Sequence, residues 1–216
     1  VKPILYGSRL MKFLTGFSSI RKLMSRYIGG KLMKTFGGEL VFFGIGGGAL
    51  CAEVEAFLRE AGFPYAIGYG LTETAPLLAG TNAHNTRYRS TGPAVKDVII
   101  KISDPDPQTG EGEILVKGPN LMKGYYKDPE RTKEIFTPDG WLKTGDLGLF
   151  GEDNYLYILG RKKNVIVGAS GENIYPEEIE AVLNECELVE ESLVYQAGGK
   201  MIARVHLNYD KIDIRF

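Results

Sequence analysis

The sequence has few of the residues that build metal centres and disulfide frameworks. Its 216 residues include only two cysteines and two histidines. Cys51 and Cys186 lie far apart and belong to no metal-binding or redox spacing, which excludes a zinc ribbon or a disulfide-stapled scaffold. His84 and His206 match no functional pattern either. Because unpaired, widely separated thiols are typical of a reducing compartment, we expect a cytoplasmic protein.

Long apolar runs and a large net charge are also missing. No apolar run has the length needed to span a bilayer, and the one near the start is interrupted too early for a signal-peptide core. The formal net charge is −1, with 44% hydrophobic and 25% charged residues, which excludes a strongly basic nucleic-acid binder and an acidic tail. This composition predicts a globular chain with one sizeable core or two smaller ones.

Charge is nevertheless unevenly distributed. The first 38 residues carry eight lysines and arginines and no acid, mixed with Leu, Met, Phe and Ile. One interpretation is an interfacial helix that contacts an anionic membrane. The other is a helix that packs on the core and exposes a basic face to solvent. A strand-like pattern is still under way at Phe216, so we expect the chain to be a piece of a longer protein.

The first third of the chain has an α/β pattern. A short buried strand is predicted at residues 40–43 and a second at 63–70. Between them, Gly62 ends a helix whose apolar positions are spaced i, i+3, i+4, i+7: Val54, Phe57, Leu58 and Ala61. A strand, helix and strand of these lengths predict a parallel pair joined by a right-handed crossover.

From about residue 90 the pattern becomes all-β and then α+β. Alternating Val98, Ile100 and Ile102 predict a strand, and further strand-like runs follow turns at 104–112 and 151–154. Such meanders favour a small barrel or sandwich. After Arg161, a helix is predicted from Pro176, followed by two strands. Its predicted apolar face consists of Ile179, Val182, Leu183 and Cys186.

The stretch "GYGLTETAPLLAG" at residues 68–80 places polar residues directly after the second predicted strand. Ligands of open α/β sheets bind at such strand ends. Glycines admit close approach of a ligand, a threonine hydroxyl can donate to a phosphate, and a glutamate can hold Mg²⁺. Taken alone, the stretch is equally consistent with a glycine-rich turn capped by threonine.

Further motifs occur before and after this stretch. They are "GIGGGALCAEVEAFL" from residue 44, "GYYKDPERT" at 124–132, "GWLKTGDLG" at 140–148 and "GRKKNVIVGASGENIYPEEIE" at 160–180. In this order and at these spacings, they resemble the adenylate-forming superfamily. They look most like long-chain fatty acid:CoA ligases, the AMP-forming acyl-CoA synthetases. The resemblance covers the chain from residue 38 onward.

The resemblance implies a fold and a division into domains. Residues 1–159 would be the C-terminal part of the large adenylate-binding domain, with an α/β portion at 1–85 and a β-barrel subdomain at 86–159. Residues 160–216 would begin the small, mobile α+β domain. The family uses ATP, Mg²⁺ and coenzyme A. It first joins a carboxylate to the α-phosphate of ATP, releasing pyrophosphate, and then transfers the acyl group to the coenzyme A thiol.

Family roles for the first group of residues follow from the motif positions. Tyr69 would pack against adenine, whose other face lies on the glycine segment 46–49. Thr72 would donate to the α-phosphate, and Glu73 would hold Mg²⁺. The remaining nucleotide-binding positions in these motifs are Gly47, Gly48 and Gly70.

Later motifs supply a second group. Asp146 and Arg161 match contacts to the ribose, Lys163 matches the hinge between the domains, and Gly171 lies in a segment like the wall of the coenzyme A tunnel. Three of them have an ordinary alternative: Asp146 as a turn aspartate, Arg161 as a surface ion-pair arginine and Gly171 as a turn glycine.

The sequence departs from the family in two ways. The usual "GGAPL" is "GGGAL" here, so Gly48 and Ala49 replace alanine and proline, which loosens the adenine platform. The chain also contains neither a "TSGSTGxPKG"-like phosphate loop nor the late Gly-Lys that supplies the adenylation lysine. We therefore expect the whole protein to be the enzyme and this chain alone not to complete the reaction.

Two alternative functions stay open. A related ligase would activate an aryl, medium-chain or amino acid, because the residues that shape the acid pocket lie largely outside this chain. A non-catalytic module would bind a nucleotide or lipid with the same fold. We expect small-molecule substrates and no nucleic-acid partner.

Overall fold

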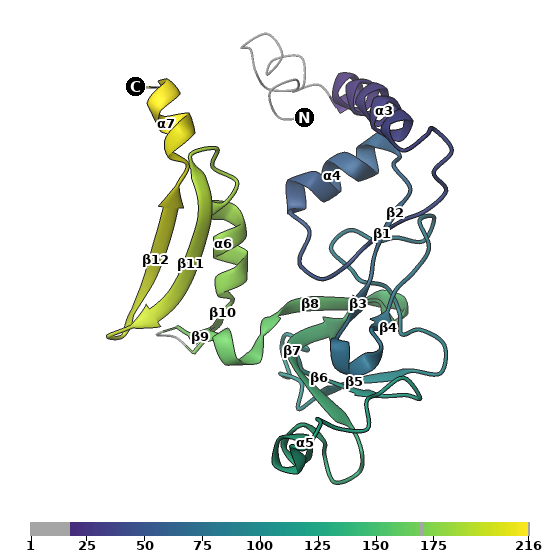
Figure 1. Ribbon diagram of the computed structural model, residues 1–216, viewed down its shortest axis with the longest axis vertical. Helices are drawn as coiled ribbons and strands as arrows, with labels where there is room; N and C mark the ends of the chain where they lie inside the picture. Colours follow the sequence, from purple (N-terminus) through teal and green to yellow (C-terminus); the bar gives the residue numbers. More distant parts are fainter. Residues whose placement is uncertain (1–17, 169–170, 216) are drawn as a thin grey trace. The chain divides into compact units, whose positions relative to one another are not determined.

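The computed structural model describes residues 18–168 and 171–215, which form two compact units (Figure 1). The first unit runs to Asp97 and includes Glu152–Leu156. The second unit contains Val98–Gly151 and the described chain from Tyr157 onward. The predicted domain boundary at residues 159 and 160 stays a prediction.

The first unit contains the predicted strand, helix and strand. Strands β1 (Phe43–Ile45) and β2 (Tyr65–Ile67) pair in parallel, and helix α4 (Ala52–Ala61) connects them. The parallel pair is confirmed, whereas the predicted position of the first strand was wrong because β1 begins only at Phe43. Val41 and Phe42 are 82% and 52% exposed, and β2, the only strand paired with β1 in the described chain, starts opposite Phe43. The handedness of the connection stays a prediction.

Helix α4 ends as predicted, and part of its predicted apolar face packs on the core, because Leu58 is buried and Phe57 packs against the same cluster. Gly62 caps it in the left-handed conformation, with φ 68° and ψ 29°, which glycine adopts without strain. Of the predicted apolar face, Val54 is 45% exposed, and the buried residues of the helix are Glu55 and Leu58. A carboxylate takes a core position here because polar groups around it supply hydrogen bonds.

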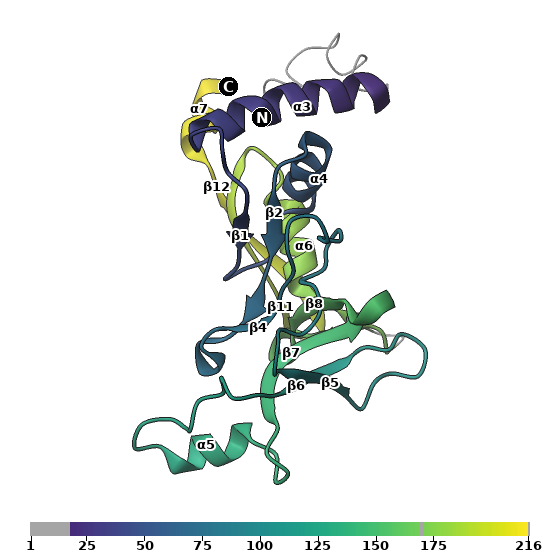
Figure 2. The same ribbon diagram turned by 90° about the vertical axis from the view of Figure 1, so that its right-hand side faces the viewer.

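Helix α3 (Ser18–Thr35) packs against α4 (Figure 2). Arg21 Nε donates to Glu60 Oε1 at 2.8 Å, and Ser25 is 1% exposed. A Cβ atom at Gly29 would lie 2.7 Å from Ala61 Cβ, so the helices approach closely. For the described part of the basic segment, these contacts favour the core-packing interpretation; residues 1–17 lie outside the described chain. None of the helices within 18–168 and 171–215 has the length and apolarity to span a membrane.

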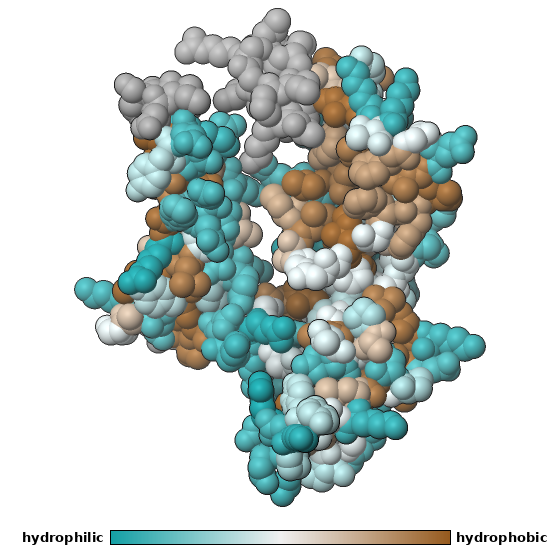
Figure 3. Space-filling model, in the orientation of Figure 1, coloured by the Kyte–Doolittle hydropathy of each residue, from teal (hydrophilic) through white to brown (hydrophobic). Residues whose placement is uncertain are grey.

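The remainder of the first unit is built from short elements. Strands β3 (Tyr69–Gly70) and β4 (Leu77–Ala79) pair antiparallel across the 3₁₀ turn η1 (Thr72–Thr74). The hydrophobic core contains Leu58, Phe63 and Tyr65, with residues of α3 and β1 packed around them. Figure 3 shows apolar surface over the region of α4, β1 and β2.

The second unit begins with the predicted meander. Its four-stranded sheet has the order β5 (Ile99–Ser103), β6 (Gly112–Lys117), β7 (Leu142–Phe150) and β8 (Leu156–Arg161). Helix α5 (Pro129–Ile135) precedes β7, and the 3₁₀ turn η2 (Glu152–Asn154) precedes β8. In the described chain β5 and β8 are the edges of the sheet, so a closed barrel subdomain stays a prediction.

The later part of the second unit has the predicted α+β order. Its elements are η3 (Lys162–Asn164), β9 (Ile166–Val167), β10 (Asn173–Ile174), α6 (Pro176–Leu183), β11 (Val189–Ala197), β12 (Lys200–Leu207) and α7 (Tyr209–Arg215). Pro176 occupies the first turn of α6 as predicted, and β11 pairs with β12. The predicted apolar face of α6 was partly wrong, since Val182 is 67% exposed and Cys186 is exposed beyond the end of the helix.

Candidate functional site

The glycine segment, residues 46–49, and Tyr69 leave the parallel sheet at the same edge. The segment follows β1, Tyr69 follows β2 closely, and the Gly68 N–H donates to Ile45 O at 2.8 Å between them. A Cβ atom at Gly46 would lie 3.6 Å from Gly68 O. The carboxyl ends of neighbouring parallel strands therefore bring the predicted platform and the predicted aromatic residue together.

The glycine segment is open, whereas Tyr69 is held in the fold. No heavy atom lies within 4 Å of a Cβ atom built at Gly47 or Gly48. The Tyr69 residue is only 9% exposed. An open stretch of backbone and a buried aromatic residue therefore follow neighbouring strands, and the adenine role of both stays a prediction.

The turn that carries Thr72 and Glu73 is closed by a buried hydroxyl. Thr74 is 0% exposed, and its Oγ1 lies 2.6 Å from Pro76 O and 2.9 Å from Leu71 O. The Leu71 N–H donates to the same Oγ1 at 3.0 Å. Thr72 is exposed and Glu73 is half-buried on this turn. Thr74 was not predicted from the sequence, although a short hydroxyl side chain that can bond to nearby backbone is a recognisable signal in a turn.

Gly70 lies where two segments of the chain approach each other closely. A Cβ atom at this position would lie 1.7 Å from Pro76 O, which is backbone and cannot move aside cheaply. Glycine at 70 is therefore required for the turn to close. By allowing the turn to close, Gly70 fixes the positions of Thr72 and Glu73. Its own role in nucleotide binding stays a prediction.

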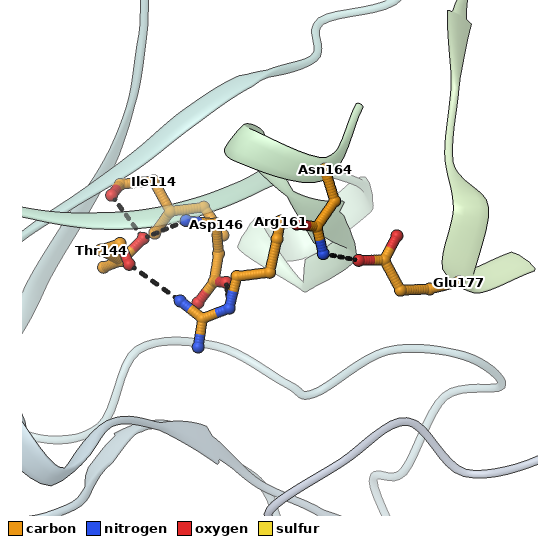
Figure 4. Close-up of polar contacts among 6 residues, drawn as sticks. All are labelled: Ile114, Thr144, Asp146, Arg161, Asn164 and Glu177. Carbon is orange, nitrogen blue, oxygen red and sulfur yellow. Dashed lines mark hydrogen bonds and ion pairs between the residues drawn. The ribbon is translucent and has the colours of Figure 1, made fainter. Parts of the chain in front are cut away.

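In the second unit, the two predicted ribose contacts are bonded to each other (Figure 4). Arg161 Nε lies 3.0 Å from Asp146 Oδ1, and Arg161 Nη1 donates to Thr144 O at 3.2 Å. The Asp146 side chain is 7% exposed and that of Arg161 is 47% exposed. Thr144 Oγ1 donates to Ile114 O at 2.9 Å and accepts from the Asp146 N–H at 3.1 Å, which fixes β7 here. A carboxylate has several acceptor positions, so Asp146 can take a hydroxyl donor while it holds the arginine.

Lys163 lies in η3, directly after β8, between two residues with polar partners. Lys162 Nζ is 2.7 Å from Glu113 Oε2, and Asn164 Nδ2 donates to Glu177 Oε1 at 2.7 Å (Figure 4). The neighbours of Lys163 therefore hold η3 from both sides in this conformation.

Gly171 is exposed, with φ 89° and no atom within 4 Å of a built Cβ. Its N–H donates to Gly168 O at 3.0 Å, which makes it a turn glycine with open space beside it. This geometry suits both the turn and the tunnel-wall interpretations.

The described residues contain no cluster of three or more His, Cys, Asp or Glu side chains that could hold a metal ion. The magnesium role of Glu73 stays a prediction. Mg²⁺ in nucleotide sites is commonly bound through one or two carboxylates together with phosphate oxygens and water. Glu73 fits a magnesium ion that arrives with a nucleotide.

Comparison with known proteins agrees with this geometry. Residues 12–126, more than half of the chain, match the family described as AMP-binding enzyme. The chain belongs to this family. Its two parallel strands, the glycine segment and the Thr72–Glu73 turn lie within the matched residues, while Asp146 and Arg161 lie beyond them.

Several curated relatives cover most of the chain. Long chain acyl-CoA synthetase 7, peroxisomal, of Arabidopsis thaliana is 35% identical over 202 residues, 89% of this chain and 29% of the relative. Long-chain-fatty-acid–CoA ligase FadD15 of Mycobacterium tuberculosis is 36% identical over 80% of this chain and 28% of its own length. The 2-succinylbenzoate–CoA ligase of Enterococcus faecalis is 37% identical over 76% of this chain and 34% of its own length. The chain thus spans about a third of the relatives that it matches.

Solved structures of similar fold include ligand complexes. O-succinylbenzoate coenzyme A synthetase (MenE) from Bacillus subtilis in complex with AMP has a TM-score of 0.69 and 32% identity, covering 82% of this chain and 40% of that one. The same synthetase is known with ATP and magnesium ion, with a TM-score of 0.67 and 32% identity over 82% of this chain and 40% of that one. ATP-bound MatB from Rhodopseudomonas palustris has a TM-score of 0.63 and 34% identity over 77% of this chain and 34% of that one.

Proposed function

We propose that the whole protein is an AMP-forming acid–CoA ligase that activates a long-chain fatty acid. One observation carries the proposal: the open glycine segment and Tyr69 follow neighbouring parallel strands, and Tyr69 leads into the closed turn with Thr72 and Glu73. Membership of the AMP-binding enzyme family and the ligands in the structures of relatives support it.

In the first proposed step, a carboxylate oxygen of the acid attacks the α-phosphorus of ATP. The bond from this phosphorus to the oxygen that bridges to the β-phosphate breaks, and pyrophosphate leaves with the bonding electrons. Thr72 would donate a hydrogen bond to the α-phosphate, where negative charge grows. Glu73 would help hold Mg²⁺, which supplies Lewis-acid stabilisation of the phosphates.

In the second proposed step, the thiol of coenzyme A attacks the acyl carbonyl carbon. The bond from this carbon to the adenylate oxygen breaks, AMP leaves, and the thiol proton passes to solvent. Asp146 and Arg161 would hold the ribose through both steps. Lys163 would be the hinge of a small domain beginning at residue 160, and Gly171 would leave room for coenzyme A.

The proposed substrate is a long-chain fatty acid because several relatives carry that activity in their names. An aryl or other acid is the alternative, favoured by the 2-succinylbenzoate–CoA ligase among the relatives. A non-catalytic binding module is less well supported, because Thr72, Glu73 and Asp146 have the side-chain chemistry that adenylation needs.

The experiment measures pyrophosphate release by the full-length protein with ATP, Mg²⁺ and octanoate, laurate, palmitate, oleate or 2-succinylbenzoate. We expect the largest release with palmitate and oleate, and acyl-CoA and AMP once coenzyme A is added. Background release with both long acids, together with turnover of 2-succinylbenzoate, would favour the alternative acid. Nucleotide binding without turnover of any acid would favour the binding module.

We also propose a cytoplasmic protein, supported by the two free cysteines. Peripheral contact with anionic membranes is a further proposal. One face of α3 packs against α4, as described above, and the proposal concerns the opposite face, where Leu23 and Tyr27 are 72% and 66% exposed among basic residues. Full-length protein should pellet with vesicles of phosphatidylserine and phosphatidylcholine at low salt, and replacing both residues with serine should abolish pelleting. A supernatant that retains the wild-type protein would overturn the membrane proposal.

A further inference from the structure

Arg89 has a backbone conformation that is rare for a side-chain-bearing residue. Its φ is 64°, in the left-handed region that glycine adopts without cost. Such a conformation persists only where surrounding contacts determine it. Here the Arg89 N–H donates to both carboxylate oxygens of Glu55, at 3.0 and 3.2 Å.

Glu55 is a firm anchor for this backbone. It lies on α4 and is 0% exposed. The Tyr65 hydroxyl, on β2, donates to Glu55 Oε1 at 2.9 Å, so the buried carboxylate receives donors from two different parts of the chain. Hydrogen bonds to a buried charge are strong and costly to break, which keeps the backbone at Arg89 in place.

The Arg89 side chain extends from this anchored backbone to the end of the glycine segment. Arg89 Nη1 donates to Leu50 O at 2.7 Å. Leu50 directly follows residues 46–49, whose glycines have no side chains with which to hold the segment. The Arg89 guanidinium is therefore a side-chain contact that fixes this end of the segment.

We propose that Arg89 is a positioning residue that holds the glycine segment in the conformation that binds the nucleotide. The proposal rests on the function proposed above and adds a residue outside the motifs that suggested it. Arg89 acts through Leu50 and touches no substrate. The hydrogen bonds from the Arg89 N–H to Glu55 fix the position of the guanidinium, and the guanidinium in turn fixes the end of the glycine segment at Leu50.

The Arg89→Gly variant isolates the side chain. Glycine adopts φ 64° freely and retains the N–H that donates to Glu55, so the fold should be as stable as the wild type or more stable. In the full-length protein we expect KM for ATP to rise about three- to tenfold, the range for loss of one hydrogen bond, with kcat little changed. Arg89→Lys retains a donor on a long side chain and should restore part of the loss.

Hydrogen exchange provides a readout that does not depend on activity. Without nucleotide, backbone amides 47–51 should exchange faster in Arg89→Gly than in the wild type. The matched control is Arg87→Ala, which removes a nearby arginine that donates to a different backbone carbonyl, Glu152 O at 2.9 Å. This control should leave both KM for ATP and exchange at 47–51 unchanged.

Each outcome decides a different part of the proposal. Unchanged exchange at 47–51 in Arg89→Gly would overturn the contact as a restraint on the segment. Faster exchange with an unchanged KM for ATP would overturn its role in nucleotide binding. A wild-type protein that binds and consumes no ATP would overturn the proposed function, and with it the nucleotide role of Arg89, while the exchange data would still decide the restraint.

Discussion

In the first unit, the predicted contacts to the nucleotide are mostly bare backbone and short side chains, held by buried polar groups. Glu55 and Thr74 supply this support, and both are 0% exposed. In the second unit, the predicted contacts are two charged side chains, Asp146 and Arg161, that bind each other 3.0 Å apart. The predicted contacts in the first unit thus depend on the shape of the fold, and those in the second unit depend on charge.

This difference predicts different responses to mutation. Substitutions of Glu55 and Thr74 in the first unit should change stability or the geometry of binding, because these side chains bond to other protein groups and not to the ligand. Charged residues in the second unit should affect affinity with little change in stability, because the Arg161 side chain is 47% exposed and stays solvated when its partner is removed. Each prediction below tests one side of this comparison.

The largest effect is expected for Glu55→Leu. The variant leaves the buried Tyr65 hydroxyl and the Arg89 N–H without their acceptor, and each unsatisfied donor costs about 1–3 kcal/mol. We expect a loss of about 2–4 kcal/mol in the unfolding free energy of the first unit, measured as a lower thermal midpoint of the full-length protein. Glu60→Leu is the control on the same helix, because it breaks a partly exposed pair with Arg21 and should cost about 1 kcal/mol or less. Equal losses in the two variants would contradict a special role for Glu55.

Asp146→Ala should weaken binding in the second unit without a large loss of stability. The change removes charge-assisted hydrogen bonds to the ribose, each worth about 1.5–3 kcal/mol. We expect a non-hydrolysable acyl-adenylate to bind about 10- to 100-fold more weakly, measured by titration calorimetry. Glu113→Ala breaks the pair with Lys162 and serves as the control. Equal affinity of Asp146→Ala and wild type would refute the ribose role.

Lys163→Pro tests the hinge. Proline fixes φ near −65° and removes an N–H, which restricts motion at η3 without removing a predicted ligand contact. We expect one half-reaction of the full-length protein to slow about tenfold more than the other, with adenylate affinity little altered. Single-turnover measurements of adenylate formation and of thioester formation separate the two. Matching losses in both, or in neither, would place the hinge elsewhere.

The smallest effect concerns pH and belongs to the first unit. The pKa of Tyr65 is raised to about 12: burial is the main cause, Arg59 opposes it, and the hydrogen bond to Glu55 adds to it. Because the folded state favours the protonated phenol, the stabilisation is complete below the ordinary pKa of 10.0 and is lost as pH rises toward 12. Thermal midpoints of wild type and Tyr65→Phe should therefore converge over this range. A difference that stays constant with pH would contradict the assignment.

Local patterns in the sequence predicted much of the fold. Apolar spacing and Gly62 gave helix α4 and its end, and alternating residues gave β5 to β8, because these signals act over a few neighbouring positions. Motif order predicted the glycine segment and Tyr69, which the parallel pairing of β1 and β2 brings together. Their roles toward a nucleotide stay predictions.

What the sequence could not predict depends on partners distant in the chain. Glu55 would be expected on a solvent face, and only the donors at Tyr65 and Arg89 make its burial favourable. The left-handed conformation of Arg89 has no local signal, since glycine and asparagine are its usual occupants. The exposure of Val41 and Val182 likewise depends on which segments pack beside them, which apolar periodicity does not specify.

The close approach at Gly70 limits which sequences can encode this turn. A Cβ atom would lie 1.7 Å from Pro76 O, so every other amino acid, alanine included, would force the backbone apart. A library with all twenty residues at position 70, selected for function, should return glycine alone, whereas Gly48, with open space around it, should accept small residues. The codon for Gly70 would then tolerate silent changes only, and a missense variant there would be read as inactivating without any knowledge of the substrate.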